Sequence, residues 1–364
     1  MAQRRVTLRD VAELAGVSPT TASMVLNGKA RDYGISEACI RRVQHAAAGA
    51  GYAPNHHAMS MRLGRSMTIG MAVNVAGYRQ GIQPLPLTDN PYYIGLIFGA
   101  EGAIHEAGYD FLLIGPGKDM DARSRAVEAL RRGQIDALLA DHLPPAGAEP
   151  DPPQPIAVVL PIQETALPTI EFDHASAARR IAEHLAELGH RCILWLGPSE
   201  EVNRETLVLR AASQAGLHMV SRIYELLNHS DYEDKPHYEV YRVESARRAL
   251  AEQLAKPRDF TAVVAYSDRV AMGACRALRQ AGLRVPEDVS VVGWDNTPAS
   301  GLFDPPLTTI DHAFAEMGYQ AGRLACEMAR GGRQAVARLQ GECVTVPAKL
   351  LVRESSGPAG GEGT

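Results

Sequence analysis

The feature that most constrains the fold is a helix–glycine–helix pattern close to the N-terminus. Thr7 and Asp10 have the three-residue spacing of a capping box, which predicts that a helix begins directly after Thr7. Gly16 provides the tight turn between two short helices, and Ser18 followed by Pro19 is a typical start for the second of them. The pattern therefore predicts a helix-turn-helix unit.

A third helix is expected after a loop, because Ser36 is a good helix cap and the apolar residues Ile40, Val43 and Ala47 follow it at helical spacing. The second helix begins with small hydroxyl side chains. These suit phosphates and base edges, because the positive end of the helix dipole attracts anions and short side chains permit close approach. A plain three-helix domain that contacts another protein is the alternative at this point.

The charge distribution favours a polyanionic partner for this segment. Residues 1–66 contain nine Arg and Lys against four Asp and Glu, although the whole chain has a net charge of −5. A basic head on an acidic body is typical of a protein whose head binds nucleic acid. A merely solvated charged face would give the same counts.

Composition indicates a reducing compartment and no membrane insertion. The five cysteines are far apart and form no C-x-x-C pair, as expected of reduced thiols in the cytoplasm. The basic N-terminal residues are not followed by the apolar stretch of a signal peptide. No apolar run approaches the roughly 20 residues that a membrane helix needs. We therefore expect a cytoplasmic protein.

From Met67 onward, short apolar runs alternate with helical segments, which predicts a parallel α/β architecture. This part is long enough for two lobes. The P-loop and the patterns G-x-G-x-x-G, H-E-x-x-H and G-x-S-x-G do not occur, so the nucleotide-binding and hydrolase templates fail. His56 and His57 are too few for a metal site. We expect no enzyme, no metal and no cofactor.

The N-terminal segment resembles the LacI family of bacterial transcription repressors. The resemblance rests on Asp10-Val11-Ala12, Ala15-Gly16-Val17-Ser18, Val25-Leu26-Asn27, Ile35-Ser36-Glu37-Ala38 and Gly51-Tyr52-Ala53-Pro54-Asn55. It implies that the second helix enters the major groove of DNA with Pro19, Thr20 and Met24 at the base-reading positions. The implied DNA-contacting residues are Thr7, Ser18, Pro19, Thr20, Thr21, Ser23, Met24, Asn27, Asn55, Ala58, Met61 and Arg62.

Residues 54–66 are expected to form a hinge, in which Asn55 begins and Gly64 ends a short helix. Such a helix is marginal alone, since helices below roughly 12 residues are rarely stable in water. The resemblance implies that it forms in the minor groove of the operator, paired with the hinge of a second protomer. Met61 stands where the family has a leucine that wedges between base pairs, and methionine is apolar enough to keep this role.

The remainder resembles the family's periplasmic-binding-protein-like core, through Gly189-His190-Arg191, Ala265-Tyr266-Ser267-Asp268, residues 282–293 and Pro306-Leu307-Thr308-Thr309-Ile310. In such folds the ligand binds between two lobes at the carboxyl ends of strands. The effector site implied position by position consists of Asn90, Tyr92, Tyr93, Asp173, Arg204, Ser267, Trp294, Asp295 and His312.

These residue types suit a sugar, because arginine donates, carboxylates accept from hydroxyl groups, and aromatic faces stack on a sugar ring. Capping or core packing is the alternative for each of Asp295, Trp294 and the Tyr92–Tyr93 pair. Ser267 and His312 depart from the amide side chains that are frequent at their positions.

The patterns together predict an all-α helix-turn-helix head and an α/β two-lobed periplasmic-binding-protein-like core. The expected domains are residues 1–53 for DNA binding, 54–66 for the hinge, 67–354 for effector binding and dimerisation, and 355–364 for a flexible tail.

The tail has no heptad pattern, so we expect a homodimer without a tetramerising zipper. The expected function is a transcriptional regulator, in the first place a repressor. Its affinity for a pseudo-palindromic double-stranded DNA operator would be controlled by a small polar effector, such as a sugar. A solute-binding protein with an added head and a sugar-acting enzyme are the alternatives, and salt-dependent binding to duplex DNA discriminates among the three.

Overall fold

The computed structural model describes residues 6–52, 60, 64–73, 91–117, 120–141, 155–160, 165–198, 202–224 and 238–360. The chain divides into two compact units, Met1–Ser66 and Met67–Thr364, and each unit has a buried core of its own. The hinge residues Asn55, Ala58, Met61 and Arg62 lie outside the described residues, as does Asn90.

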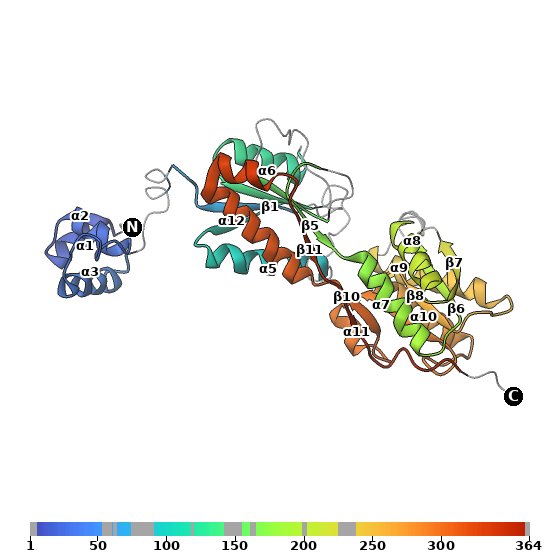
Figure 1. Ribbon diagram of the computed structural model, residues 1–364. Coiled ribbons are helices and arrows are strands. Elements are labelled where there is room, and N and C mark those ends of the chain that lie inside the picture. Colours follow the sequence, from blue (N-terminus) through green and yellow to red (C-terminus); the bar gives the residue numbers. More distant parts are fainter. Residues whose placement is uncertain are drawn as a thin grey trace. The chain divides into compact units, whose positions relative to one another are not determined.

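The N-terminal unit contains α1 (Leu8–Ala15), α2 (Pro19–Leu26) and α3 (Glu37–Gly49) (Figure 1). The capping box forms as predicted: Thr7 Oγ1 accepts from the Asp10 amide at 3.3 Å, and Asp10 Oδ2 accepts from the Thr7 amide at 2.7 Å. Gly16 ends α1 with a φ of 61°, a left-handed conformation that glycine adopts without strain. The core that joins the three helices consists of Val11, Ala12, Ala15, Ala22, Val25, Ala30, Val43 and Ala47.

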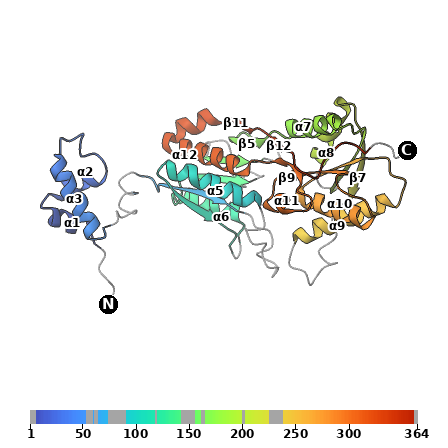
Figure 2. The ribbon, with the colours of Figure 1, turned by 90° about the horizontal axis from the view of Figure 1, so that it is seen from below.

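The second unit is built on two six-stranded sheets flanked by helices (Figures 1 and 2). The first sheet has the order β11-β5-β4-β3-β1-β2 and is entirely parallel. Its strands are β1 (Thr68–Ala72), β2 (Asp110–Ile114), β3 (Ala137–Asp141), β4 (Ile156–Val159), β5 (Thr169–Phe172) and β11 (Cys343–Val346).

The second sheet has the order β12-β10-β9-β8-β6-β7, with only β12 antiparallel to its neighbour. Its strands are β6 (Cys192–Pro198), β7 (His218–Tyr224), β8 (Ala262–Ala265), β9 (Ser290–Asp295), β10 (Thr308–Asp311) and β12 (Lys349–Leu351). The strand order reverses between β6 and β8. The carboxyl ends of these two strands therefore form a topological switch point, the place where open α/β sheets bind ligands.

Helices cover both sheets, and the chain passes between the sheets after β5, after β10 and between β11 and β12. Among the described residues, no helix is both long and apolar enough to cross a membrane. The helices are α5 (Pro91–Glu106), α6 (Ala122–Arg131), α7 (His174–Glu187), α8 (Val202–Gln214), α9 (Tyr238–Leu254), α10 (Asp268–Gln280), α11 (Pro298–Leu302) and α12 (Phe314–Leu339).

Helices α5 and α12 lie side by side in both views and contact each other through glycines (Figures 1 and 2). A methyl group on Gly99 of α5 would clash with the carbonyl oxygen of Ala315 on α12. A methyl group on Gly318 of α12 would clash with the carbonyl oxygen of Leu96 on α5. Small residues on both helices therefore allow their backbones to approach closely.

The prediction of a flexible tail from residue 355 is wrong for the described part of that segment. Ser355 is completely buried, and its hydroxyl donates to the Val291 carbonyl at 2.6 Å and accepts from the Thr308 amide at 2.8 Å. The Gly357 amide donates to Ser290 Oγ at 3.0 Å. These long-range hydrogen bonds fix the segment to β9 and β10, although its glycine, proline and serine content is typical of a linker.

Replacing Ser355 by alanine is expected to lower the free energy of unfolding by about 1–3 kcal/mol, because the buried Thr308 amide loses its hydrogen-bond acceptor. Glu354→Ala is the matched control, since its side chain is exposed on the preceding residue. Denaturant unfolding of both variants measures the difference. Equal stability of the two variants would contradict the buried role of Ser355.

Candidate functional site

The exposed start of α2 presents the residues that the sequence analysis assigned to DNA reading. Ser18 caps the helix by accepting from the Thr21 amide at 3.1 Å, while Ala22 and Val25 point into the core. Ser18, Pro19 and Thr20 are exposed, and Met24 is half-buried one turn later. Asn27 ends the helix and donates from Nδ2 to the Ser23 carbonyl at 2.5 Å. The start of α2 therefore combines short polar side chains with the positive end of the helix dipole.

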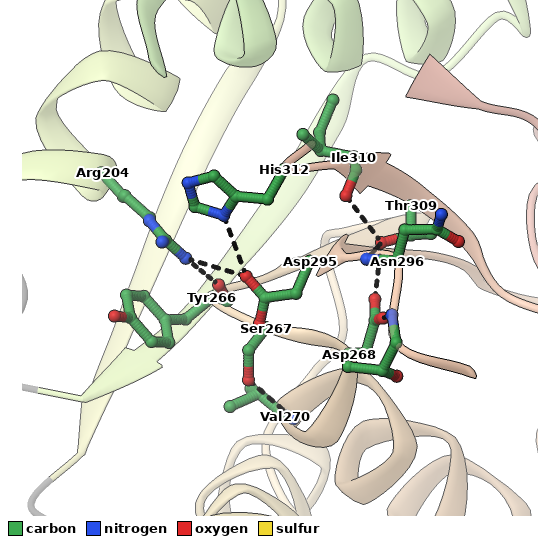
Figure 3. A network of polar contacts seen from close by, with 11 residues as sticks. Arg204, Tyr266, Ser267, Asp268, Val270, Asp295, Asn296, Thr309, Ile310 and His312 are labelled. Atoms are coloured by element: carbon green, nitrogen blue, oxygen red, sulfur yellow. Dashed lines mark hydrogen bonds and ion pairs between the residues drawn. The ribbon is translucent and has the colours of Figure 1, made fainter. Parts of the chain in front are cut away.

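In the second unit, polar side chains gather at the carboxyl ends of β8, β9 and β10 (Figure 3). Arg204 Nη1 of α8 lies 3.8 Å from Asp295 Oδ1, and His312 Nδ1 lies 3.3 Å from the same oxygen. Trp294 precedes Asp295 and is completely buried. We call Arg204, Tyr266, Trp294, Asp295 and His312, together with His174, the strand-end cluster.

Arg204 is held in place from several directions. Its Nη1 donates to the Tyr266 carbonyl at 2.9 Å in addition to the ion pair with Asp295. Its guanidinium carbon lies 4.5 Å from the ring centre of Tyr266 and 5.1 Å from that of Trp294. Such cation–π contacts orient a guanidinium group and leave it only edges for further hydrogen bonds.

The backbone is strained on both sides of the Asp295–His312 contact. Asp295 and Asn296 have φ angles of 111° and 52°, and Ala313, which follows His312, has a φ of 50°. Non-glycine residues rarely adopt such angles, and they concentrate at functional sites where the surroundings enforce them. The strain therefore marks the same place as the polar cluster.

Asp268 is the buried anchor of this strained turn. Its Oδ2 accepts from the Thr297 amide at 2.6 Å. Its Oδ1 accepts from Thr309 Oγ1 at 2.5 Å (Figure 3). Burial and the nearby carboxylate of Asp295 raise the pKa of Asp268 to about 7. Arg353 fixes Asn296, the residue after Asp295, by donating to Asn296 Oδ1 at 2.7 Å.

Three buried ring nitrogens of the strand-end cluster have no hydrogen-bond partner among the described residues: Trp294 Nε1, His312 Nε2 and His174 Nδ1. Buried polar atoms are normally paired, so these three nitrogens require an explanation, and their position at a strained strand end makes the strand-end cluster our candidate ligand site. The rings themselves are packed: His312 stacks on Phe314 with ring centres 4.5 Å apart, and it lies tilted against Phe172 with ring centres 4.1 Å apart.

Both histidines are held in the neutral form. Burial and the positive charge of Arg204 lower the pKa of His174 to about 2 and lower that of His312 well below its ordinary value. Arg204 and His312 act on the ring of His174, whereas Arg204, Asp295 and His174 lie near the ring of His312.

Stability is expected to depend on these two histidines below about pH 6.5. Their pKa values are lowered in the fold, so the unfolded chain alone takes up protons, and each histidine costs about 1.4 kcal/mol per pH unit below about pH 6.5. The double variant His174→Gln/His312→Gln should therefore lose less stability than the unmodified protein between pH 7.5 and pH 5.5.

The readout is the difference between the melting temperatures of the two proteins at each pH. The contributions of groups such as Asp268, which titrate in both proteins, cancel in this difference. Parallel curves over this range would show that the two imidazoles are not kept neutral by the fold.

Several residues assigned to the effector site from sequence have structural contacts elsewhere. Asp173 caps α7 by accepting from the Ser176 amide at 2.8 Å, and Ser267 caps α10 by accepting from the Val270 amide at 3.4 Å. Tyr93 donates to Asp141 Oδ2 at 2.6 Å at the end of β3. Tyr92 contacts Phe314, with ring centres 5.3 Å apart, and Phe314 stacks on His312. The structure brings Arg204, Trp294, Asp295 and His312 together directly.

The sequence analysis missed His174, Asp268 and Tyr266 as members or supports of this site. Asp268 and Tyr266 lie inside the quoted Ala265–Asp268 motif, and His174 follows the predicted Asp173, so adjacency was the only available signal. Among the described residues, no group of three His, Cys, Asp or Glu side chains is arranged to hold a metal ion.

Comparison with known proteins identifies the family. Residues 7–55 match the family described as "Bacterial regulatory proteins, lacI family", and residues 182–356 match the "Periplasmic binding protein-like domain". The chain belongs to the LacI family. The regulator CelR of Thermobifida fusca is 29% identical over 364 residues, which cover 97% of this chain and 99% of CelR. The ribose operon repressor of Escherichia coli K12 is 29% identical over 330 residues, which cover 86% of this chain and 89% of that repressor.

Solved structures of LacI-family proteins share the fold. A CelR–cellobiose complex has a TM-score of 0.62 at 26% identity, and covers 97% of this chain and 100% of that one. The Lac repressor dimer bound to operator and an anti-inducer has a TM-score of 0.71 at 24% identity, with the same coverage. These relatives are transcriptional regulators and not enzymes, and the helix-turn-helix head with a two-lobed α/β core is confirmed.

Proposed function

We propose that this LacI-family protein is a repressor that binds a pseudo-palindromic DNA operator as a homodimer in the cytoplasm. A small polar effector, in the first place a sugar, controls its operator affinity from the strand-end cluster. The observation that carries the proposal is the set of buried ring nitrogens, beside Arg204 and Asp295, that have no partner in the described part of the chain and lie at strand ends, where such folds bind ligands. Cellobiose and ribose in complexes of related regulators support a carbohydrate.

The DNA-binding part of the proposal is tested by salt-dependent affinity. The purified protein is used to select operators from random duplexes, and its affinity for the best duplex is measured between 50 mM and 200 mM salt. Counterion release predicts that the affinity falls by about 1,000-fold or more over this range if six or more phosphates are contacted. Weak binding that is independent of salt would contradict the proposal and favour a solute-binding protein.

Met24 is expected to read a thymine methyl group, because its half-buried side chain is apolar and follows the exposed start of α2 by one turn. Met24→Ala should reduce the preference for thymine at one operator position about fivefold, which is close to 1 kcal/mol. Operators with each base at every position measure this effect.

Leu14→Ala is the control for the loss of an apolar side chain from the same unit, since Leu14 on α1 is 67% exposed. An unchanged preference at every position in Met24→Ala, with its melting temperature preserved, would remove Met24 from the readout.

A further inference from the structure

The protonation of His312 determines which kind of hydrogen-bonding group a ligand must present to it. Its Nδ1 lies 3.3 Å from Asp295 Oδ1, and the carboxylate beside Arg204 is an acceptor. His312 is completely buried in a neutral state, so its single ring proton lies on Nδ1 and donates to Asp295. Its Nε2 is then a bare lone pair, without a partner among the described residues. Only a hydrogen-bond donor can satisfy it.

Trp294 contributes the opposite polarity. An indole Nε1–H is a donor only, and this one is buried without an acceptor among the described residues. The Trp294 indole lies against the Arg204 guanidinium and 6.0 Å from the ring of His174. A hydroxyl group both donates and accepts, so a pair of hydroxyl groups satisfies His312 and Trp294 together. A carboxylate or phosphate group placed against His312 only accepts and leaves Nε2 unsatisfied, although the hydroxyl groups of the same compound can still donate to it.

The charge of Arg204 is already balanced. Asp295 Oδ1 lies 3.8 Å from Arg204 Nη1, and the Tyr266 carbonyl accepts from the same nitrogen. The rings of Tyr266 and Trp294 also lie close to the guanidinium group. An anion that approaches Arg204 is therefore repelled by the carboxylate of Asp295. This repulsion weakens the binding of an anion and does not affect a neutral hydroxyl group.

We propose that the strand-end cluster selects an uncharged polyhydroxy effector by its hydroxyl protons, with His312 Nε2 as the acceptor that makes a donor obligatory. Trp294 Nε1 donates to a hydroxyl oxygen of the same ligand, and sugar acids and sugar phosphates are rejected. The inference rests on the proposed function, because it assigns the chemical class of effector that the regulator senses.

The first test is binding by the full-length protein to matched sets of compounds, measured by calorimetry. Each set contains a neutral sugar, the corresponding acid and the corresponding phosphate, such as glucose, gluconate, glucuronate and glucose 6-phosphate, or ribose and ribose 5-phosphate. The tightest ligand is expected to be neutral and to exceed its charged analogues at least 30-fold. A charged analogue that binds more tightly than its neutral parent would overturn the inference.

The second test separates donation from acceptance with deoxy and deoxyfluoro analogues of the tightest neutral ligand. Fluorine cannot donate a proton, so at one position the fluoro analogue should lose as much affinity as the deoxy analogue, at least tenfold. In the His312→Gln variant, the loss of affinity on fluorination at this position should be smaller, because the glutamine amide can donate a hydrogen bond as well as accept one. His105→Gln, which changes an exposed histidine of α5, is the control. Fluoro analogues that bind like the parent at every position would contradict the role of His312.

The two hypotheses fail in different ways. If a sugar acid or sugar phosphate binds most tightly and changes operator affinity, the regulator function stands and the selection of uncharged ligands is wrong. If a neutral sugar binds with the expected pattern and operator affinity does not change, the ligand class stands and effector control of DNA binding is wrong.

Discussion

Arg204→Ala is expected to abolish control of DNA binding by the effector while leaving DNA binding itself intact. The substitution removes the guanidinium group that pairs with Asp295 and contacts the rings of Tyr266 and Trp294. We expect effector affinity to fall about 100-fold, equivalent to about 2.7 kcal/mol, because charged hydrogen bonds in a largely buried site are lost together with the orientation of both rings.

Arg210→Ala is the matched control, since Arg210 is an exposed arginine on the same helix, α8. Calorimetry gives effector affinity, and operator titration gives DNA affinity for both variants. Melting temperatures identify any general loss of stability from the carboxylate that remains at Asp295. Effector affinity in Arg204→Ala within about threefold of the control would remove the strand-end cluster as the effector site.

Gly99→Ala is expected to lower the free energy of unfolding by about 3 kcal/mol, at the upper end of the range for overpacking. The added methyl group would clash with the Ala315 carbonyl oxygen. This oxygen belongs to the backbone of α12, so it cannot move aside by a change of side-chain rotamer. Gly102→Ala on the same helix is the matched control, because a methyl group there meets nothing within 4 Å. That control should be neutral or slightly stabilising, since alanine favours helix more than glycine does.

Chemical denaturation of Gly99→Ala and Gly102→Ala measures the difference directly. Equal stabilities would show that α5 and α12 can separate without cost, contrary to the close backbone approach. Because Phe314 at the start of α12 stacks on His312, the variant also tests whether this packing affects effector affinity.

The sequence predicted local features well because their causes are local. The Thr7–Asp10 capping box and the Ser18–Pro19 start of α2 need only neighbouring residues, and both form as expected. The tail from Ser355 was mispredicted because its partners, the Val291 carbonyl and the Thr308 amide, are distant in sequence. Composition alone does not reveal such hydrogen bonds.

The candidate site was predictable in position and only partly in membership. Arg204, Asp295 and His312 come together because the ends of parallel strands meet at one edge of the sheet. Asp173 caps α7, whereas the adjacent His174 joins the aromatic contacts around His312. The chain crosses between sheets at this point, and the direction of each side chain depends on that crossing, which no periodicity encodes.

The most direct test of the account is the operator affinity of the full-length protein with and without a saturating effector, with binding of both ligands verified by calorimetry. The account predicts a change of about 5–150-fold, which corresponds to a coupling of about 1–3 kcal/mol, and an equal change in effector affinity when operator is present. In Arg204→Ala operator affinity should be unaffected by the same effector concentration. An operator affinity that stays constant while the strand-end cluster is occupied would contradict the account.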